Sequence, residues 1–231
     1  MSSPVVRLKP LASSPRLREQ VYQELKRAIS EMDIYCGPQA PKLDERRLAE
    51  DMGVSRTPVR EAITRLEQEG LVETMPRRGT YVVRKTKAQI IEIIQVWAAL
   101  EGMAARMATQ RASDAELASL RKLFSTFDDG EQAQARIDEY SERNLQFHQR
   151  LVELSRCRLL SDITDGLFVQ MRAIRRKTIT EKNRAAESVI DHIRIIEALE
   201  ARDARHAARL VEEHAMSLAS HVERHVDYLD E

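Results

Sequence analysis

The sequence predicts a mainly α-helical protein, in which a small N-terminal domain with a β-hairpin precedes an all-helical bundle of about six helices. Three observations lead to this fold class. The 231 residues include only seven Gly, seven Pro and 4% aromatic residues, too few for the many turns of a β sandwich. Apolar residues recur at three- and four-residue steps along most of the chain, which is the period of an amphipathic helix. The stretches that favour strands are short and confined to residues 71–83.

The N-terminal part is expected to begin with a flexible tail over residues 1–15, which carry three prolines and no sustained period. Apolar residues then recur every four positions across residues 17–29, which predicts an amphipathic helix. A stretch with Gly and Pro, residues 35–41, ends this helix. A short helix is expected over residues 45–52, with Asp44 as its cap.

A further helix and a hairpin complete a winged helix-turn-helix, which we expect over residues 16–84. Ser55 is placed to cap a helix with Val59, Ile63 and Leu66 on its inward face. Two β-prone runs follow, separated by Pro76-Arg77-Arg78-Gly79. This pattern predicts a hairpin with a basic tip.

The basic residues of this part are spaced as a DNA-recognition surface requires. Arg56, Thr57 and Arg60 lie in the first turns of the last helix, where donors can reach base edges and phosphates. Arg offers two parallel donors to guanine O6 and N7, and Arg77 and Arg78 make the hairpin tip basic. The spacing of the charges alone also fits a solvated helix face. The ordered set of cap, basic first turns and basic wing favours DNA binding.

After residue 83 nothing favours a strand, and we expect a helical domain over residues 87–231. The expected helices cover residues 87–111, 114–127, 133–156, 158–178, 182–202 and 204–229. The chain has 37 basic and 37 acidic residues in total, but residues 1–85 hold 16 basic and 12 acidic ones. All six histidines lie in the acidic remainder. The segregation suggests two kinds of chemistry in two domains, with an anionic partner for the basic one.

Four residues of the helical domain form a candidate metal site. Asn144 and His148 are four positions apart on one expected helix, so their side chains point the same way. His192 and His214 lie on two later helices. Three imidazoles and one amide oxygen inside a bundle suit a divalent transition ion. The alternative is a set of scattered surface or core histidines.

Other residues of these types are not expected to bind anything. His206, His221 and His225 are expected to face solvent. Met103, Met107 and Met171 are expected to fill the core. The two cysteines, Cys36 and Cys157, lie too far apart to suggest a metal pair and indicate a reduced compartment.

The stretch LDERRLAEDMGVSRTPVREAITRLEQEGLVETMPRRGTYV resembles the DNA-binding domain of the GntR family of bacterial transcription regulators. The resemblance is most specific in GVSRTPVREAI and EGLV. It implies operator contacts by Arg46, Arg56, Thr57, Arg60 and Gly79. The family usually has a Gly-x-x-x-Pro-Gly approach before the second helix, and residues 33–41 depart from it.

The segments VWAALEGMAARMATQ, NLQFHQRLVELSRCRLL and DHIRIIEALEARDARHAARLVEEH resemble the FCD effector-binding domain, in its VanR-like branch. The resemblance implies a divalent metal, zinc or nickel, on three histidines and an Asp, and His148, His192 and His214 match. Asn144 stands at the Asp position and is a weaker, neutral donor. Trp97 stands where the family often has an Arg that can hold an acidic effector. Arg172 is a candidate substitute for it.

Together these patterns predict a ligand-responsive transcription regulator, a repressor or an activator, and not an enzyme. It would bind a pseudo-palindromic double-stranded DNA operator as a homodimer and respond to a small organic acid. Ile90, Ile94 and Trp97 are candidate dimer contacts. The alternatives are a helical metalloenzyme with an accessory nucleic-acid-binding domain and a non-specific nucleic-acid binder.

The chain shows neither a membrane span nor a targeting segment by its composition. No apolar run approaches the ~20 residues of a membrane helix. The first residues lack the apolar core of a signal peptide. We therefore expect a cytoplasmic protein with no membrane partner.

Overall fold

The computed structural model describes residues 15–35, 39–127, 130–181, 184–227 and 229. The tail expected over residues 1–15 lies, up to residue 14, outside them. The described elements, in chain order, are α1 (Pro15–Glu31), β1 (Lys42–Leu43), α2 (Glu45–Asp51), α3 (Arg56–Gln68), β2 (Val72–Met75), β3 (Gly79–Val82), α4 (Lys87–Arg111), α5 (Asp114–Lys122), α6 (Gly130–Ala135), α7 (Ile137–Leu154), α8 (Arg158–Thr178), α9 (Arg184–Glu200) and α10 (Ala204–His225).

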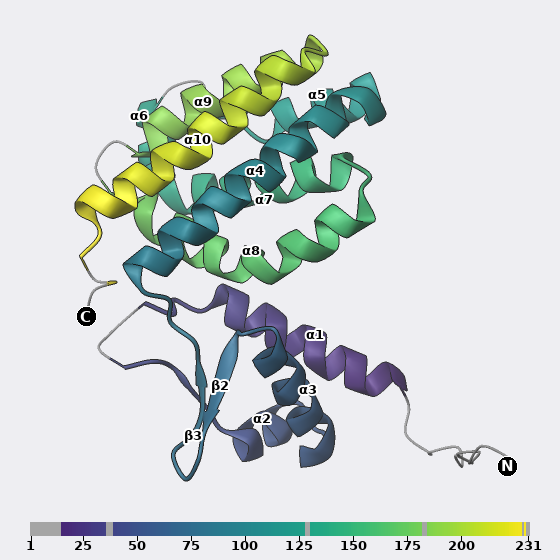
Figure 1. The fold of residues 1–231 in the computed structure, drawn as a ribbon, viewed down its shortest axis with the longest axis vertical. Helices are drawn as coiled ribbons and strands as arrows, with labels where there is room; N and C mark the ends of the chain where they lie inside the picture. The colour runs from purple at the N-terminus through teal and green to yellow at the C-terminus, as the bar shows by residue number, and fades with distance from the viewer. Residues whose placement is uncertain (1–14, 36–38, 128–129, 182–183, 228, 230–231) are drawn as a thin grey trace, which may run out of the picture. The chain divides into compact units, whose positions relative to one another are not determined.

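The chain folds into two compact units (Figure 1). The winged unit contains Met1–Ile29 and Pro41–Val83. The helical unit contains Arg84–Glu231 and also Ser30–Ala40, the segment between the first helix and β1. The mainly α-helical fold class is confirmed.

The winged unit is a helix-turn-helix followed by a small antiparallel sheet of order β1-β3-β2. Asp44 caps α2, because its side chain accepts hydrogen bonds from the backbone N–H groups of Arg46 and Arg47. Gly53 has a φ of +64° in the turn to α3, a conformation that glycine adopts without strain. Val59 and Leu66 of α3 are fully buried. The structure corrects one detail, since the Ser55 side chain forms no capping hydrogen bond.

The predicted hairpin consists of β2 and β3, with Met75 paired to Gly79 at its tip. The two-residue strand β1, which the sequence pattern did not predict, pairs with the other edge of β3. A strand of two residues is too short to show the alternation from which strands are predicted.

The helical unit is built around α4. Thr86 begins this helix with a capping box, in which it exchanges hydrogen bonds with Gln89. α4 and α10 lie side by side (Figure 1). At Gly102 they approach so closely that a Cβ atom would lie 2.5 Å from Glu212 Oε1. Because Glu212 is exposed, its side chain could move aside, so a larger residue at this crossing would shift Glu212 and need not move the helices apart.

The segment expected as one helix over residues 133–156 is interrupted at Arg136, so the described bundle includes the short α6 before α7. The other five expected helices correspond to α4, α5, α8, α9 and α10.

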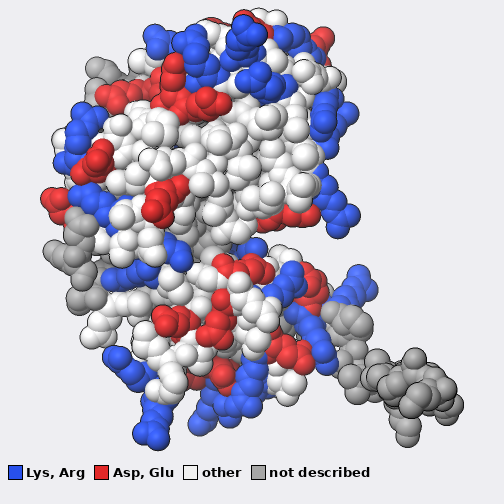
Figure 2. Space-filling model, viewed as in Figure 1, with Lys and Arg blue, Asp and Glu red and all other residues white. Residues whose placement is uncertain are grey.

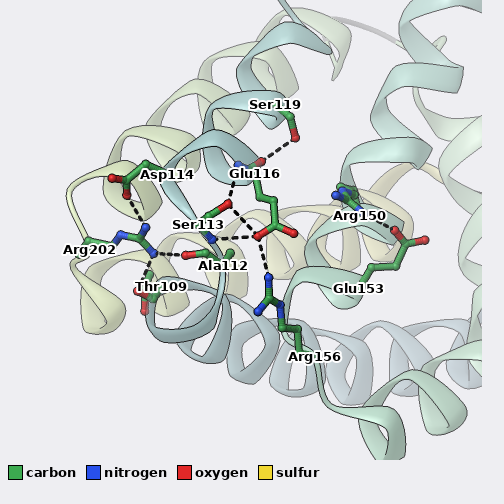
Figure 3. Close-up of polar contacts among 10 residues, drawn as sticks. All are labelled: Thr109, Ala112, Ser113, Asp114, Glu116, Ser119, Arg150, Glu153, Arg156 and Arg202. Carbon is green, nitrogen blue, oxygen red and sulfur yellow. Dashed lines mark hydrogen bonds and ion pairs between the residues drawn. The ribbon is translucent and has the colours of Figure 1, made fainter.

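One end of the bundle is held by arginines that reach across from neighbouring turns (Figure 3). Arg202, between α9 and α10, donates from Nη1 to the carbonyl oxygens of Thr109 and Ala112, at 3.0 and 2.7 Å. Its Nη2 contacts Asp114. Arg156, between α7 and α8, donates to Glu116 at 2.9 Å. These contacts connect two turns to the junction of α4 and α5.

The expected dimer contacts Ile90, Ile94 and Trp97 are wrong, because all three are buried inside the chain at 0–1% exposure. They face the bundle core. The exposed face of α4 instead carries Val96 and Met103, at 52% and 45% exposure, so Met103 is not core filler. α4 is also long and apolar enough to cross a membrane by length and composition, a test that the core helix of a bundle passes equally well.

Candidate functional sites

The first candidate site is the basic surface of the winged unit. Arg46 of α2 and Arg56 and Arg60 of α3 have side chains that are 79%, 55% and 59% exposed. Thr57 is exposed in the first turn of α3. The exposed backbone N–H groups of that turn and the Thr57 hydroxyl are suited to phosphate oxygens. The side chains that the sequence singles out on these two helices are therefore available to a ligand.

The tip of the hairpin adds a second basic element. Arg77 and Arg78 are exposed there. Arg77 and Gly79 have φ values of 63° and 107°, in the left-handed region where glycine is favoured. Figure 2 shows Lys and Arg side chains at the end of the winged unit where Figure 1 draws the hairpin turn and α2. Such a surface can take an extended anion.

The second candidate site is a cluster of three buried histidines from three helices. His148 of α7, His192 of α9 and His214 of α10 are 1%, 0% and 5% exposed. One ring nitrogen of each lies within 4.8 Å of the corresponding nitrogen of the other two. The Nε2 atoms of His148 and His192 are 3.4 Å apart. The structure thus brings together the three histidines that the sequence singles out.

The Nδ1 atom of each histidine contacts an oxygen atom. His148 Nδ1 contacts Glu101 Oε1. His192 Nδ1 lies 3.2 Å from the Tyr140 hydroxyl. His214 Nδ1 lies 3.1 Å from Asp191 Oδ2. These partners fix the orientation of each ring, and the carboxylates fix the tautomer that leaves Nε2 unprotonated.

Burial keeps these imidazoles neutral. Burial and, to a lesser extent, the nearby Arg175 lower the pKa of His148 to about 3, although Glu101 opposes the change. Burial also lowers the pKa of His192 and His214 below the ordinary value. Burial alone would raise the pKa of Glu101, but His148, Arg175 and Trp97 lower it overall, so this carboxylate is charged. Neutral imidazoles are the form that binds a metal ion.

Arg175 of α8 is the basic residue beside the cluster. It is 5% exposed, and its Nη1 contacts His148 Nε2. Its Nη2 lies 3.7 Å from Glu101 Oε2, an ion-pair distance but no hydrogen bond, and its Nε has no partner among the described residues. Burial lowers the pKa of Arg175 to about 10, so it remains protonated at neutral pH. A buried guanidinium with unused donors is a candidate anion-binding group.

Asn144 and Arg172 were the other residues expected here. Asn144 is 2% exposed, and its Oδ1 has no hydrogen-bond partner among the described residues. An unpaired buried amide oxygen one turn before His148 is free to ligate. Arg172 instead pairs with Glu142 of α7, at 3.5 Å. The arginine of α8 that contacts the histidine cluster is Arg175, and the role of Arg172 in effector binding stays a prediction.

Sequence reasoning missed several residues around the cluster, and its expectation for His221 is wrong. The missed residues are Glu101, Tyr140, Arg175 and Asp191. Tyr140 precedes Asn144 by four residues, so the helical period alone placed it on the same face. His221 is 6% exposed and lies 2.7 Å from Glu181, so it does not face solvent.

Comparison with known proteins identifies the class. Residues 17–82 match the bacterial regulatory proteins of the gntR family, and residues 92–217 match the FCD domain. A winged helix-turn-helix joined to this bundle defines a class of transcription regulators, not enzymes. The chain belongs to the GntR family and carries an FCD domain.

Individual relatives agree with this assignment. The HTH-type transcriptional repressor RspR of Escherichia coli is 27% identical over 209 residues, which is 89% of each chain. The Nta operon transcriptional regulator of Aminobacter aminovorans is 30% identical over 188 residues, 81% of this chain and 84% of the relative. The solved structure of E. coli McbR/YncC is 25% identical, has a TM-score of 0.74, and is matched over 90% of this chain and 97% of the other.

Proposed function

We propose that this protein is a cytoplasmic, effector-responsive regulator that binds a pseudo-palindromic operator as a homodimer. The effector is a small organic acid, and it binds in the helical unit beside a divalent transition ion, zinc or nickel. The observation that carries this proposal is the arrangement of the three histidines, whose Nδ1 atoms each contact an oxygen atom and which bring one ring nitrogen each within 4.8 Å of the others. A core that merely buried its histidines would have no need to orient three rings toward one point.

The donor set fits an ion of this kind. Three neutral imidazoles are ordinary ligands of zinc and nickel, and the unpaired Oδ1 of Asn144 supplies a fourth, weaker donor. Arg175 Nη1 contacts His148 Nε2, so this guanidinium would have to leave that nitrogen for an ion to bind there. Glu101 and Asp191 contact the Nδ1 atoms of His148 and His214 and so hold these two rings in orientation. When bound, the ion would supply a positive centre that attracts a carboxylate.

The charges around the cluster favour an anionic effector. Glu101 and Asp191 carry two negative charges, Arg175 carries one positive charge, and a divalent ion would add two more, which leaves one positive charge in excess. A net charge in a buried site is unfavourable unless it is paired. The free Nε of Arg175 can donate to an effector carboxylate and so take the place of the Arg that Trp97 replaces. Trp97 itself donates to Glu101, at 2.7 Å.

The operator is contacted by the basic surface of the winged unit. Arg56 and Arg60 read base edges, Arg46, Thr57, Arg77 and Arg78 contact the backbone or neighbouring bases, and the wing-tip backbone at Gly79 approaches a groove. We expect Arg56→Ala and Arg60→Ala each to weaken operator binding by about 1–3 kcal/mol per half-site. Arg78→Ala should weaken it mildly and reduce its salt dependence.

The homodimer is proposed to form through the exposed face of α4 and α10. Val96 and Met103 of α4 and Met216 of α10 are exposed large apolar residues on adjacent helices. Figure 2 shows a broad uncharged area on the side of the helical unit where Figure 1 draws these helices. An apolar surface of this kind is typical of an interface.

The test combines calorimetry with DNA binding. Zn²⁺ and Ni²⁺ are titrated into the wild type, Asn144→Asp and His192→Ala. We expect one site per chain, tighter binding in Asn144→Asp because a carboxylate adds charge, and loss of the site in His192→Ala. Small mono- and dicarboxylates are then screened for release of a selected operator.

Three results would overturn parts of the proposal. If the wild type takes up no metal under any loading condition, the ion is excluded from the mechanism. If no anion changes the operator affinity of the wild type, the organic-acid effector is wrong. If an anion does so and Arg175→Met responds equally, Arg175 does not bind the effector.

A further inference from the structure

An acidic residue lies among the exposed arginines of the winged unit. Glu45 is the first residue of α2, and its Oε2 accepts a hydrogen bond from Arg60 Nε at 2.7 Å and from Arg56 Nη2 at 3.2 Å. The Glu45 side chain is 29% exposed, less than either arginine. One carboxylate on α2 therefore bridges two guanidinium groups from successive turns of α3.

The bridge leaves most donors of the two arginines free. Within the part of the chain that the structure describes, Arg60 Nη1 and Nη2 and Arg56 Nε and Nη1 form no hydrogen bond. The two terminal nitrogens of Arg60 are the pair that can bind guanine O6 and N7 together. Glu45 thus restrains the arginines through one nitrogen each and keeps a fork available for a base.

The carboxylate is charged at neutral pH. The hydrogen bond from Arg60 lowers the pKa of Glu45, partial burial opposes this, and Arg56 lowers it further. A negative charge at this place has two opposite effects on DNA binding. It repels phosphates, which weakens binding to every sequence. It also restricts the rotamers of two long side chains before DNA arrives, which favours the complex in which those rotamers fit.

We propose that Glu45 is a positioning residue that increases discrimination between operator and other DNA while lowering affinity for DNA in general. The proposal rests on the proposed reading of base edges by Arg56 and Arg60. It predicts that removing the Glu45 charge strengthens binding to non-specific DNA and lowers the ratio of operator affinity to non-specific affinity. A residue that only contributed charge would change both equally.

The test measures dissociation constants by fluorescence anisotropy for a selected operator and a scrambled duplex, over a range of salt concentrations. The variants are Glu45→Gln and Glu45→Ala. Asp51→Asn is the matched control, because it removes the same charge from the same helix. Among the described residues, Asp51 pairs with Arg47 alone, at 3.9 Å. Circular dichroism and thermal melting establish that each variant folds.

Asp51→Asn should tighten binding to both duplexes by a similar factor of about two to three, as expected for one screened charge. Glu45→Gln should tighten binding to the scrambled duplex to the same extent. It should also reduce the operator-to-scrambled ratio by about tenfold per half-site. In an Arg60→Ala background the effect of Glu45→Gln on this ratio should largely disappear, because its main partner is gone.

Three outcomes would contradict the proposal. The ratio could be unchanged in Glu45→Gln, or it could fall equally in Asp51→Asn. The loss could also be confined to one base pair and persist without Arg60, which would make Glu45 a direct reader of a base. If instead Arg56→Ala and Arg60→Ala bind the operator like the wild type, the proposed docking itself is wrong.

Discussion

Replacement of Arg202 tests whether the turn between α9 and α10 holds the end of the bundle. Arg202 has a φ of 59°, in the left-handed region that is unfavourable for residues with a Cβ. Its Nη1 donates to the carbonyl oxygens of Thr109 and Ala112, two residues near the end of α4 that are each 5% exposed. Carbonyl groups at a helix end have no partner within the helix, so this donor satisfies them.

The magnitude follows from these contacts. Removing a charged donor from buried acceptors costs about 1.5–3 kcal/mol. The pair with Asp114 adds little, because Asp114 is 95% exposed and its charge is screened by water. Arg202→Ala should therefore lower the free energy of unfolding by about 1.5–3 kcal/mol. Arg202→Gly loses the same contacts but relieves about 1 kcal/mol of backbone strain, so it should be the more stable of the two variants.

The assay is differential scanning calorimetry of the full chain, which separates the transition of the helical unit from that of the winged unit. For a unit of this size, Arg202→Ala should lower Tm by about 3–10 °C. Arg205→Ala, one turn along at an exposed site, serves as the control and should change little. The reasoning is refuted if the alanine variant is as stable as the glycine variant, or if neither differs from the control.

Three further predictions concern coupling, pH and assembly. Tyr35 donates from its buried hydroxyl to Gln170 Oε1 of α8 at 3.0 Å, so Tyr35→Phe should reduce the effect of an effector on DNA affinity, without changing the Kd of the effector itself in calorimetry. Partial burial alone would raise the pKa of Glu69, but hydrogen bonds from Tyr22 and Lys26 lower it, so Glu69→Gln should destabilise the winged unit at neutral pH. Because a lowered carboxyl pKa stabilises the folded state only while the group is ionised, this loss should vanish in melting curves as the pH falls through the lowered pKa. Met103→Glu should produce monomers in sedimentation velocity at micromolar concentration, and an unchanged dimer would exclude this face of α4.

The helical period predicts where helices lie in the sequence, but it does not tell which surface covers their apolar residues. The expected helix at residues 87–111 coincides with α4, because its capping box and apolar spacing are local signals. The same spacing marked Ile90 and Trp97 as apolar without saying whether their own bundle or a second copy would cover them. Only the packing of α4 among the other helices of the unit decides that they belong to the core.

The helical period of α8 distinguishes Arg175, which contacts the histidine cluster, from Arg172, which the sequence analysis named. Met171, Ile174 and Thr178 are buried, at 0–1% exposure, and Arg175 lies on the same stripe at the four-residue step from Met171. Arg172 lies about 100° away around the helix. The helical phase could therefore have indicated Arg175, whereas the pairing of its neighbour with Glu142 depends on tertiary contact and could not be predicted.

The assignment of residues 30–40 to the helical unit has a consequence for recombination, in which one DNA-binding module replaces another. Arg84 donates to the Ile34 carbonyl at 2.6 Å, and Lys177 lies 3.6 Å from Asp33, so this segment is held by the unit that follows it in sequence. A chimera joined at residue 84 would therefore bring a foreign connector into contact with α8 and lose these interactions. Recombination that keeps residues 30–40 with the helical unit preserves them, and requires the incoming DNA-binding module to be split into two segments. In this chain, point substitution therefore alters the DNA-binding module with less disturbance of the helical unit than exchange of the whole module would.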